Sequence, residues 1–181
     1  MQILIADDEN ISRHWLQFQL EQWGHSVLAA ENGLQAWELL QTHDCPLVIT
    51  DWEMLGLTGI ELLRKIRASD REGYVYVILP TSKTEREALV TGLVTGADDF
   101  LTKPVDQDEL RARLQPGLRI IELEQRLAER NRELKDSNSQ LFDTNGRMKR
   151  DLDAAAQIQQ AFLPSRALAI PDVHFAWHYS P

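Results

Sequence analysis

Short runs of apolar residues alternate with amphipathic stretches over about the first 115 residues. The apolar runs lack a period of two, which is typical of strands buried on both faces of a parallel sheet. Between them, apolar residues recur at helical spacing, as in Ile60, Leu63 and Ile66. The pattern predicts an α/β fold of five β-α repeats, (βα)5, with a doubly wound parallel sheet covered by helices on both faces. The expected strands are Ile3–Ala6, Val27–Ala30, Leu47–Thr50, Tyr74–Leu79 and Phe100–Leu101.

A second pattern, with a period of seven, begins near residue 120. From Ile120, an apolar residue recurs at every seventh position, and asparagine stands four residues after each of the three leucines in this series. With the leucines at position d and the asparagines at position a, the spacing predicts a parallel two-stranded coiled coil, because buried Asn at a sets the register and favours dimers. The proposed dimer seam consists of Leu127, Asn131, Leu134, Asn138, Leu141, Asn145 and Met148.

This seam is expected to be weak, because it holds three successive asparagines and because Gly146 lies within the helix. The alternative is a single amphipathic helix folded back on the first domain. It is less favoured, since a stripe only two residues wide would bury little apolar surface. Pro116 and Gly117 are expected to kink or briefly break the helix. The sequence thus divides into three predicted parts. Residues 1–115 form the first domain, residues 116–163 form the helical coiled-coil linker, and residues 164–181 form the truncated start of a second domain.

Composition narrows the functional classes. The chain has 181 residues, enough for one full domain with a substantial remainder. Its net charge of −9 argues against nucleic acid or an anionic membrane as a direct partner, since both require a basic surface. Cys45 is the single cysteine, no segment is long enough to span a bilayer, and Met1 leads directly into a strand-like run. A cytoplasmic location is therefore expected.

Polar residues stand at the carboxyl ends of four of the five predicted strands: the first, third, fourth and fifth. Each alone would be read as a helix cap or a solvated loop residue. Together they indicate a site, because ligands of parallel sheets gather at the carboxyl ends of the strands. The consecutive acids in "ILIADDEN" are explained if a hard cation with oxygen ligands binds there. The residues at the strand ends are Asp7, Asp8, Asp51, Thr81, Ser82 and Lys103.

The motifs "ADDE", "TDWEM....G", "PTS" and "GADDFLTKP" give residues 1 to about 115 a family resemblance. This part resembles the receiver domain of bacterial two-component response regulators, which has a flavodoxin-like fold. The resemblance implies that Asp51 is the phosphoacceptor and that the cofactor is Mg²⁺ or Mn²⁺. By the same resemblance, the metal ligands are Asp8, Asp51 and the backbone carbonyl of Glu53, with Asp7 acting through water.

The resemblance also gives roles to the residues near the later strands. Thr81, with Ser82 beside it, and Lys103 are expected to bind phosphoryl oxygens. Phe100 matches an aromatic switch position, with a plain core phenylalanine as the alternative. Pro104 matches a cis Lys-Pro bond. Asp99 and Arg113 are hypothesised to form an ion pair between subunits.

Two residues depart from the family pattern. Leu55 stands where the family usually has proline, and Pro80 directly precedes Thr81. Neither change removes a phosphate-binding side chain. We therefore expect them to affect the geometry of switching more than phosphorylation.

The last thirty residues carry a second resemblance. "DLDAAAQIQQAFLP", followed by "IPDVHFAWHYSP", is similar to the opening of metal-dependent serine phosphatase domains of the PPM (PP2C-like) class found in bacterial stress and sporulation regulators. The metal-binding aspartates of that class would lie beyond Pro181. We therefore interpret the chain as a fragment that is not itself an enzyme, cut from a longer protein serine/threonine phosphatase.

The combined interpretation is a response regulator of a two-component phosphorelay. It would receive a phosphoryl group from a sensor histidine kinase or phosphotransfer protein. A parallel homodimer would relay the signal to an output phosphatase acting on a phosphoprotein. The alternative is a non-catalytic adaptor whose binding depends on phosphorylation. A hydrolase of the haloacid dehalogenase type has less support, because Asp51 lacks the second Asp two residues later.

Overall fold

The computed structural model describes residues 1–71, 73–82 and 92–162. The chain divides into two compact units, Met1–Arg130 and Asn131–Pro181. We describe each unit by itself.

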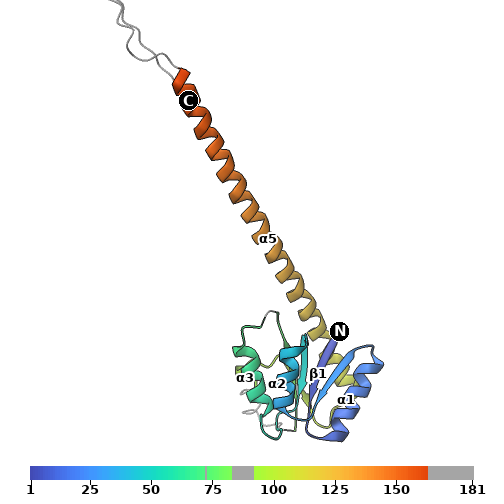
Figure 1. Ribbon diagram of the computed structural model, residues 1–181. Coiled ribbons are helices and arrows are strands. Elements are labelled where there is room, and N and C mark those ends of the chain that lie inside the picture. Colours follow the sequence, from blue (N-terminus) through green and yellow to red (C-terminus); the bar gives the residue numbers. More distant parts are fainter. Residues whose placement is uncertain (72, 83–91, 163–181) are drawn as a thin grey trace, which may run out of the picture. The chain divides into compact units, whose positions relative to one another are not determined.

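The first unit is built on a five-stranded sheet (Figure 1). All neighbouring strands are parallel, in the order β2-β1-β3-β4-β5. The chain therefore leaves β1 in one direction for β2 and returns past it for β3, which makes β1 the point where the strand order switches. The register pairs Ala6 with Thr50, so β1 and β3 end side by side. The strands are β1 Gln2–Ala6, β2 Ser26–Ala30, β3 Leu47–Thr50, β4 Tyr76–Thr81 and β5 Asp99–Thr102.

The described helices are α1 Asn10–Gln22, α2 Gly33–Thr42, α3 Gly59–Ala68 and α5 Gln107–Phe162. Side chains cap the N-termini of two of these helices, α2 and α3. Asn32 accepts a hydrogen bond from the backbone N–H of Gln35 at the start of α2. Thr58 and Glu61 form a reciprocal capping box at the start of α3. Each cap satisfies backbone donors that a helix start otherwise leaves unpaired.

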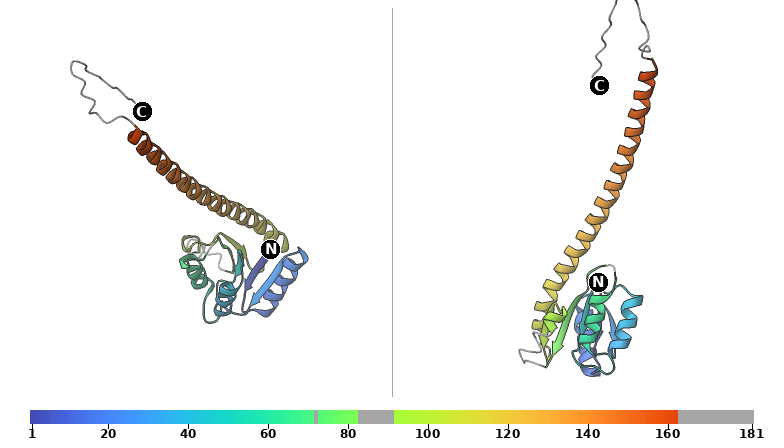
Figure 2. Two further views of the ribbon diagram at one scale, coloured as in Figure 1. Left: turned by 45° about the horizontal axis from the view of Figure 1, so that its top comes forward. Right: turned by 90° about the vertical axis from the view of Figure 1, so that its left-hand side faces the viewer.

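Two layers of helices bury the sheet (Figure 2). On one face, Leu40 of α2 and Leu63 of α3 join a core cluster with Leu4 and Val48. On the other face, α1 and the first turns of α5 pack against the alternate side chains of the same strands. This second cluster includes Leu16, Leu20, Leu110, Leu114 and Ile121 with Ile3, Ile5 and Ile49. The doubly wound (βα)5 architecture is therefore confirmed for the described part of the unit.

β4 begins two residues later than the sequence pattern predicts. Tyr74 and Val75 make side-chain-mediated bonds instead of ladder bonds: the Tyr74 hydroxyl donates to Asp98, and Arg67 Nη1 donates to the Val75 carbonyl oxygen at 2.7 Å. At its other end, β4 extends through Pro80, beyond Ile78, the last residue that pairs with β3. A proline fits there, since one flank of the strand no longer carries a ladder.

α5 continues through Pro116, so the helix does not break there; of the predicted kink or brief break, the break is wrong and the kink stays a prediction. Pro116 faces solvent, where water can take up the carbonyl group that the missing N–H leaves unpaired. Gly117 is buried, and a Cβ there would lie 2.7 Å from the Tyr76 ring. Packing against β4 thus holds the helix at the point where its own hydrogen bonding is weakest. Asp99 and Arg113, hypothesised to pair between subunits, form an ion pair within one chain at 3.1 Å.

The second unit is described from Asn131 to Phe162 and is helical throughout that range. Its large apolar side chains are exposed in the single chain: Leu134 by 62%, Leu141 by 59% and Met148 by 60%. Gly146 has open space around it. The proposed start of a phosphatase domain, residues 164–181, lies outside the described residues. Within the part that is described, no helix is long and apolar enough to cross a membrane.

Candidate functional site

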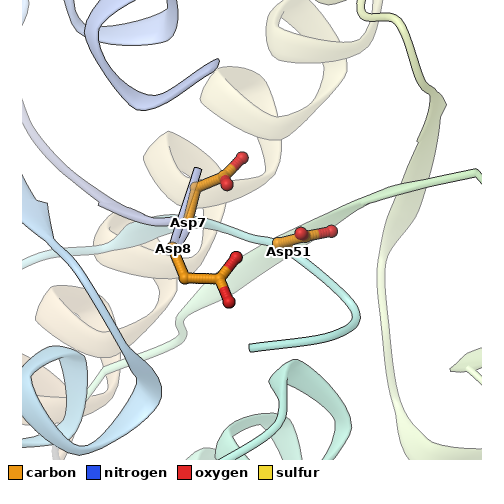
Figure 3. Close-up of side chains that lie close together, drawn as sticks. All are labelled: Asp7, Asp8 and Asp51. Carbon is orange, nitrogen blue, oxygen red and sulfur yellow. The ribbon is translucent and has the colours of Figure 1, made fainter. Parts of the chain in front are cut away.

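Three carboxylates meet at the carboxyl ends of β1 and β3 (Figure 3). Asp7 and Asp8 follow the last residue of β1, and Asp51 follows the last residue of β3. One oxygen of each carboxylate lies within 4.8 Å of the other two. Asp7 is 1% exposed, Asp51 is partly buried and Asp8 is exposed. We call Asp7, Asp8 and Asp51 the acid cluster.

Backbone hydrogen bonds hold the acid cluster on the sheet. The Asp51 N–H donates to the Ala6 carbonyl at 2.8 Å, and the Asp7 N–H donates to the Ala30 carbonyl at 3.2 Å. The loop after Asp51 then packs closely on α3, because a Cβ on Gly59 would lie only 1.9 Å from the Asp51 carbonyl oxygen. The position of Asp51 is therefore set by β1 and by the start of α3.

Lys103 brings a positive charge into the cluster from the end of β5. Its Nζ lies 2.7 Å from Asp51 Oδ2 and 3.3 Å from Asp7 Oδ2. The Lys103 N–H donates to the Thr81 carbonyl at 3.0 Å, which ties the end of β5 to the end of β4. The Lys103–Pro104 peptide bond is cis.

Burial and charge shift the pKa values of this pair. Burial raises the pKa of Asp51, and it outweighs the hydrogen bond and the charge of Lys103, which lower that pKa. For Lys103, burial alone would lower the pKa. The hydrogen bond and charge of Asp51, together with the charge of Asp7, raise it above the ordinary lysine value. Lys103 is therefore fully charged at neutral pH.

The remaining candidate residues surround this centre. Thr81 is buried at the end of β4, and Ser82 follows it on the surface. Glu53 is exposed in the loop two residues after Asp51. The Phe100 ring is partly buried and packs against the core cluster of α2 and α3; a Cβ on Gly92 would lie 2.6 Å from its tip.

The chemistry of the donor set fits a hard divalent cation. Carboxylate and carbonyl oxygens are the ligands that Mg²⁺ prefers in proteins, and the acid cluster offers three carboxylates on two adjacent strand ends. The Lys103 ammonium balances one of those charges. The cluster therefore retains a net negative charge for a cation.

A family model described as the response regulator receiver domain matches residues 3–115. The chain belongs to this family. It contains a receiver domain of a two-component response regulator, the class of domain that is phosphorylated on aspartate. Receiver domains generally bind Mg²⁺ through acidic residues such as those of the acid cluster.

Two similar curated proteins differ in how much of their length this chain spans. The phosphate regulon transcriptional regulatory protein PhoB of Pseudomonas aeruginosa is 38% identical over 117 residues, which cover 65% of this chain and 51% of PhoB. A chemotaxis protein CheY homolog of Campylobacter jejuni is 32% identical over 120 residues, covering 65% of this chain and 92% of that protein. The chain thus spans about half of the first and nearly all of the second.

Solved structures of receiver domains share the fold. The receiver domain of the Francisella response regulator 1452 has a TM-score of 0.60 and 31% identity, covering 64% of this chain and 94% of that one. The receiver domain of Saccharomyces cerevisiae Ssk1, crystallised with the histidine phosphotransfer protein Ypd1, has a TM-score of 0.58 and 26% identity, covering 62% and 85%.

Sequence reasoning missed two residues of the receiver's site, both in the first turn of α1. The Ser12 hydroxyl donates to Asp7 Oδ2 at 2.7 Å, and Arg13 Nη1 donates to the Asp7 carbonyl oxygen at 2.7 Å. A signal for Arg13 exists, since it stands three and seven residues before Leu16 and Leu20, which face the core. A charged residue on the buried face of a helix indicates a specific partner.

Proposed function

We propose that this receiver accepts a phosphoryl group on Asp51 in a reaction that requires Mg²⁺ or Mn²⁺. The observation that carries the proposal is the position of the Asp51 carboxylate, which pairs with the Lys103 ammonium and lies beside the other two acids at the switch point of the sheet. In the proposed reaction an Asp51 oxygen attacks the phosphorus, and the bond between phosphorus and the donor's nitrogen or oxygen breaks.

The residues around Asp51 have distinct proposed roles. A bound divalent cation, held by Asp8, Asp51 and the Glu53 carbonyl with Asp7 acting through water, would neutralise charge on the transferred oxygens. Lys103 would exchange its bond to Asp51 Oδ2 for a bond to a phosphoryl oxygen. Thr81, or Ser82 beside it, would donate to another phosphoryl oxygen. Phe100 would change its ring position as Thr81 moves.

The proposed phosphodonor is a sensor histidine kinase or a phosphotransfer protein. Support comes from the similarity to the receiver domain that was crystallised with a histidine phosphotransfer protein. Neither nucleic acid nor a membrane is proposed as a partner, since the chain carries a net charge of −9.

The proposed output is reached through a parallel homodimer. The exposed Leu134, Leu141 and Met148 support this proposal, because a row of large apolar side chains is costly to leave in water. The coiled coil would join two receivers to the phosphatase domains whose start is proposed at residues 164–181. Their substrate would be a phosphoprotein. A phosphorylation-dependent adaptor would use the same seam without a catalytic output.

Intact mass spectrometry tests the phosphorylation step. The full chain is incubated with acetyl phosphate, with and without Mg²⁺. We expect one added phosphoryl group, removable by hydroxylamine, only when Mg²⁺ is present. Asp51→Asn should abolish the addition. Asp44→Asn, which changes an exposed acid before the opposite, amino end of β3, should leave it intact. Undiminished labelling of Asp51→Asn would remove Asp51 from the role of phosphoacceptor.

A further inference from the structure

We propose that Arg13 is a positioning residue for the acid cluster: it fixes the peptide between Asp7 and Asp8, and thereby sets the affinity of the site for a divalent cation. The inference rests on the proposed cation site and concerns a residue outside the ligand set. The Arg13 side chain contacts the backbone of the acid cluster directly.

The Arg13 guanidinium is held on three sides. Nη1 donates to the Asp7 carbonyl oxygen at 2.7 Å, while Nη2 donates to Asn10 Oδ1 at 3.0 Å and to Glu31 Oε1 at 3.2 Å. The Arg13 residue is only 7% exposed. A buried guanidinium is costly unless its donors are used, so these contacts fix its orientation.

The bond to the Asp7 carbonyl acts on Asp8. The peptide unit is planar, so the direction of the Asp7 C=O also fixes the N and Cα of Asp8. On its other side, Asp7 is fixed by its N–H, which donates to Ala30. With both flanking peptide groups of Asp7 held, Asp8 leaves the strand in one direction, toward Asp51 (Figure 3).

The Asp7 carboxylate does not depend on Arg13. Its Oδ1 accepts from the Glu9 N–H at 2.9 Å, and its Oδ2 accepts from the Ser12 hydroxyl and from Lys103. Loss of the Arg13 side chain should therefore loosen the peptide between Asp7 and Asp8 while leaving the Asp7 carboxylate in place.

Two effects of Arg13 on a cation oppose each other. As a positive charge near the acid cluster it repels a cation, so its removal would tighten binding if Coulomb repulsion dominated. As a positioning group Arg13 favours cation binding, so removal of its side chain would weaken that binding. The charge of Arg13 is partly neutralised by Glu31, whereas its hydrogen bond to the cluster is direct. We therefore expect positioning to dominate. The sign of the change in affinity separates the two effects.

Titration of the full chain with MgCl₂ gives the readout. Trp52 directly follows Asp51, and its backbone N–H donates to Asp51 Oδ1 at 2.7 Å, so a cation that binds Asp51 should change the environment and the fluorescence of Trp52. Trp52→Phe serves as the optical blank for the other tryptophans. The variants are Arg13→Met, which keeps the length of the stem and removes the donors, Arg13→Lys, which keeps the charge and one donor group, and Glu31→Gln, which removes only the exposed ion-pair partner.

We expect Arg13→Met to raise the Kd for Mg²⁺ about tenfold, the lower end of the effect of residues that orient metal ligands. Arg13→Lys should raise it about threefold, and Glu31→Gln less than twofold, because Glu31 does not touch the cluster. At saturating Mg²⁺, the rate of phosphorylation by acetyl phosphate should return to near the wild-type value in every variant. A merely structural role would lower that rate together with the urea midpoint and would not be relieved by Mg²⁺.

An unchanged or lower Kd in Arg13→Met overturns the inference. If Arg13→Met does not fold, Arg13→Lys decides: a raised Kd supports positioning, and an unchanged or lower one contradicts it. Asp8→Asn separates this inference from the proposed function. Unaltered Mg²⁺ binding in Asp8→Asn removes the cation site itself, whereas weakened binding there with no effect at Arg13 removes only the role of Arg13.

Discussion

Asp51 experiences opposing forces within a few ångströms. Its carboxylate is paired with Lys103 at 2.7 Å, yet burial and the neighbouring Asp7 leave its pKa above the ordinary value of 3.8. The charged form is thus held less favourably in the folded chain than in the unfolded one. Such a residue is disposed to take up a new partner.

The raised pKa predicts that Asp51→Asn stabilises the chain at neutral pH in the absence of a cation. An acid with a raised pKa binds more protons folded than unfolded, so its contribution to stability falls as pH rises through the window above 3.8. Asparagine removes this loss, while Lys103 keeps Asp7 as a partner. Urea unfolding should show a higher midpoint for Asp51→Asn at neutral pH and a smaller difference below about pH 4. A lower midpoint at neutral pH would mean that the pair with Lys103 outweighs burial.

Gly59 predicts a second effect at the scale of one residue. A Cβ at this position would lie 1.9 Å from the Asp51 carbonyl oxygen, a backbone atom that cannot move without the site. Gly59→Ala should lower the free energy of unfolding by about 2 kcal/mol, in the range of overpacked interiors. Chemical denaturation measures it.

Gly146→Ala is the matched control for this change. Gly146 has nothing within 4 Å of a new Cβ, so the same substitution should raise the stability of the helix by up to about 1 kcal/mol. Equal effects at both positions would contradict the close contact at Gly59.

At the scale of elements, α5 contains Pro116, which has no backbone N–H and therefore leaves one hydrogen bond of the helix unmade. Pro116→Ala would add an N–H for the Ala112 carbonyl and would lose no buried contact, because Pro116 is exposed. We expect stability to rise by about 1 to 3 kcal/mol, the range between a partly relieved and a fully relieved proline. Thermal unfolding followed by circular dichroism tests this. An unchanged or lower melting temperature would show that Pro116 stabilises the junction in another way.

Elements differ in how well the sequence predicted them, and the reasons are local. The central strands β1, β3 and β4 were predictable because burial on both faces leaves uninterrupted apolar runs. The acid cluster was predictable because its members directly follow two of these runs. The start of β4 was not predictable, since Tyr74 bonds to Asp98, which lies far along the chain. The continuity of α5 through Pro116 was not predictable either, because it depends on the packing of Gly117 against Tyr76. The helical spacing of Arg13 with Leu16 and Leu20 places it on the buried face of α1, but its partner could not be predicted because that partner is a backbone carbonyl.

At the scale of the whole molecule, the chain combines a sheet packed on both faces with a helix whose large apolar side chains beyond Ile121 are exposed in the part of the chain that the structure describes. Leu127 and Leu134 are exposed by 56% and 62% in the single chain, whereas the largest side chains of the receiver core are completely buried. Asn131 between them, with Asn138 and Asn145 farther along the helix, makes any seam marginal. A marginal seam is one that small changes at the receivers can tighten or loosen.

The proposed parallel dimer predicts that Leu134→Asp combined with Leu141→Asp yields a monomer, since each substitution would place a charge in the seam. Ser139→Asp combined with Gln140→Asp adds the same charge off the seam and should leave the dimer intact. Truncation after Leu114 should give a monomer or a weak dimer. Multi-angle light scattering measures all three. A dimer that survives the double leucine variant would contradict the seam.

Cys45 makes the orientation of such a dimer open to a covalent test. It is the chain's single cysteine, it is completely buried, and burial raises the pKa of its thiol, so it holds little of the reactive thiolate while the protein is folded. A cysteine introduced by Asn138→Cys would therefore be the reactive thiol of the native chain. Two parallel, in-register helices bring identical a positions together, and mild oxidation would join them as a disulfide; antiparallel helices would keep them apart. Because the buried Cys45 thiol does not react, a covalent dimer on a non-reducing gel would show that the two helices are parallel.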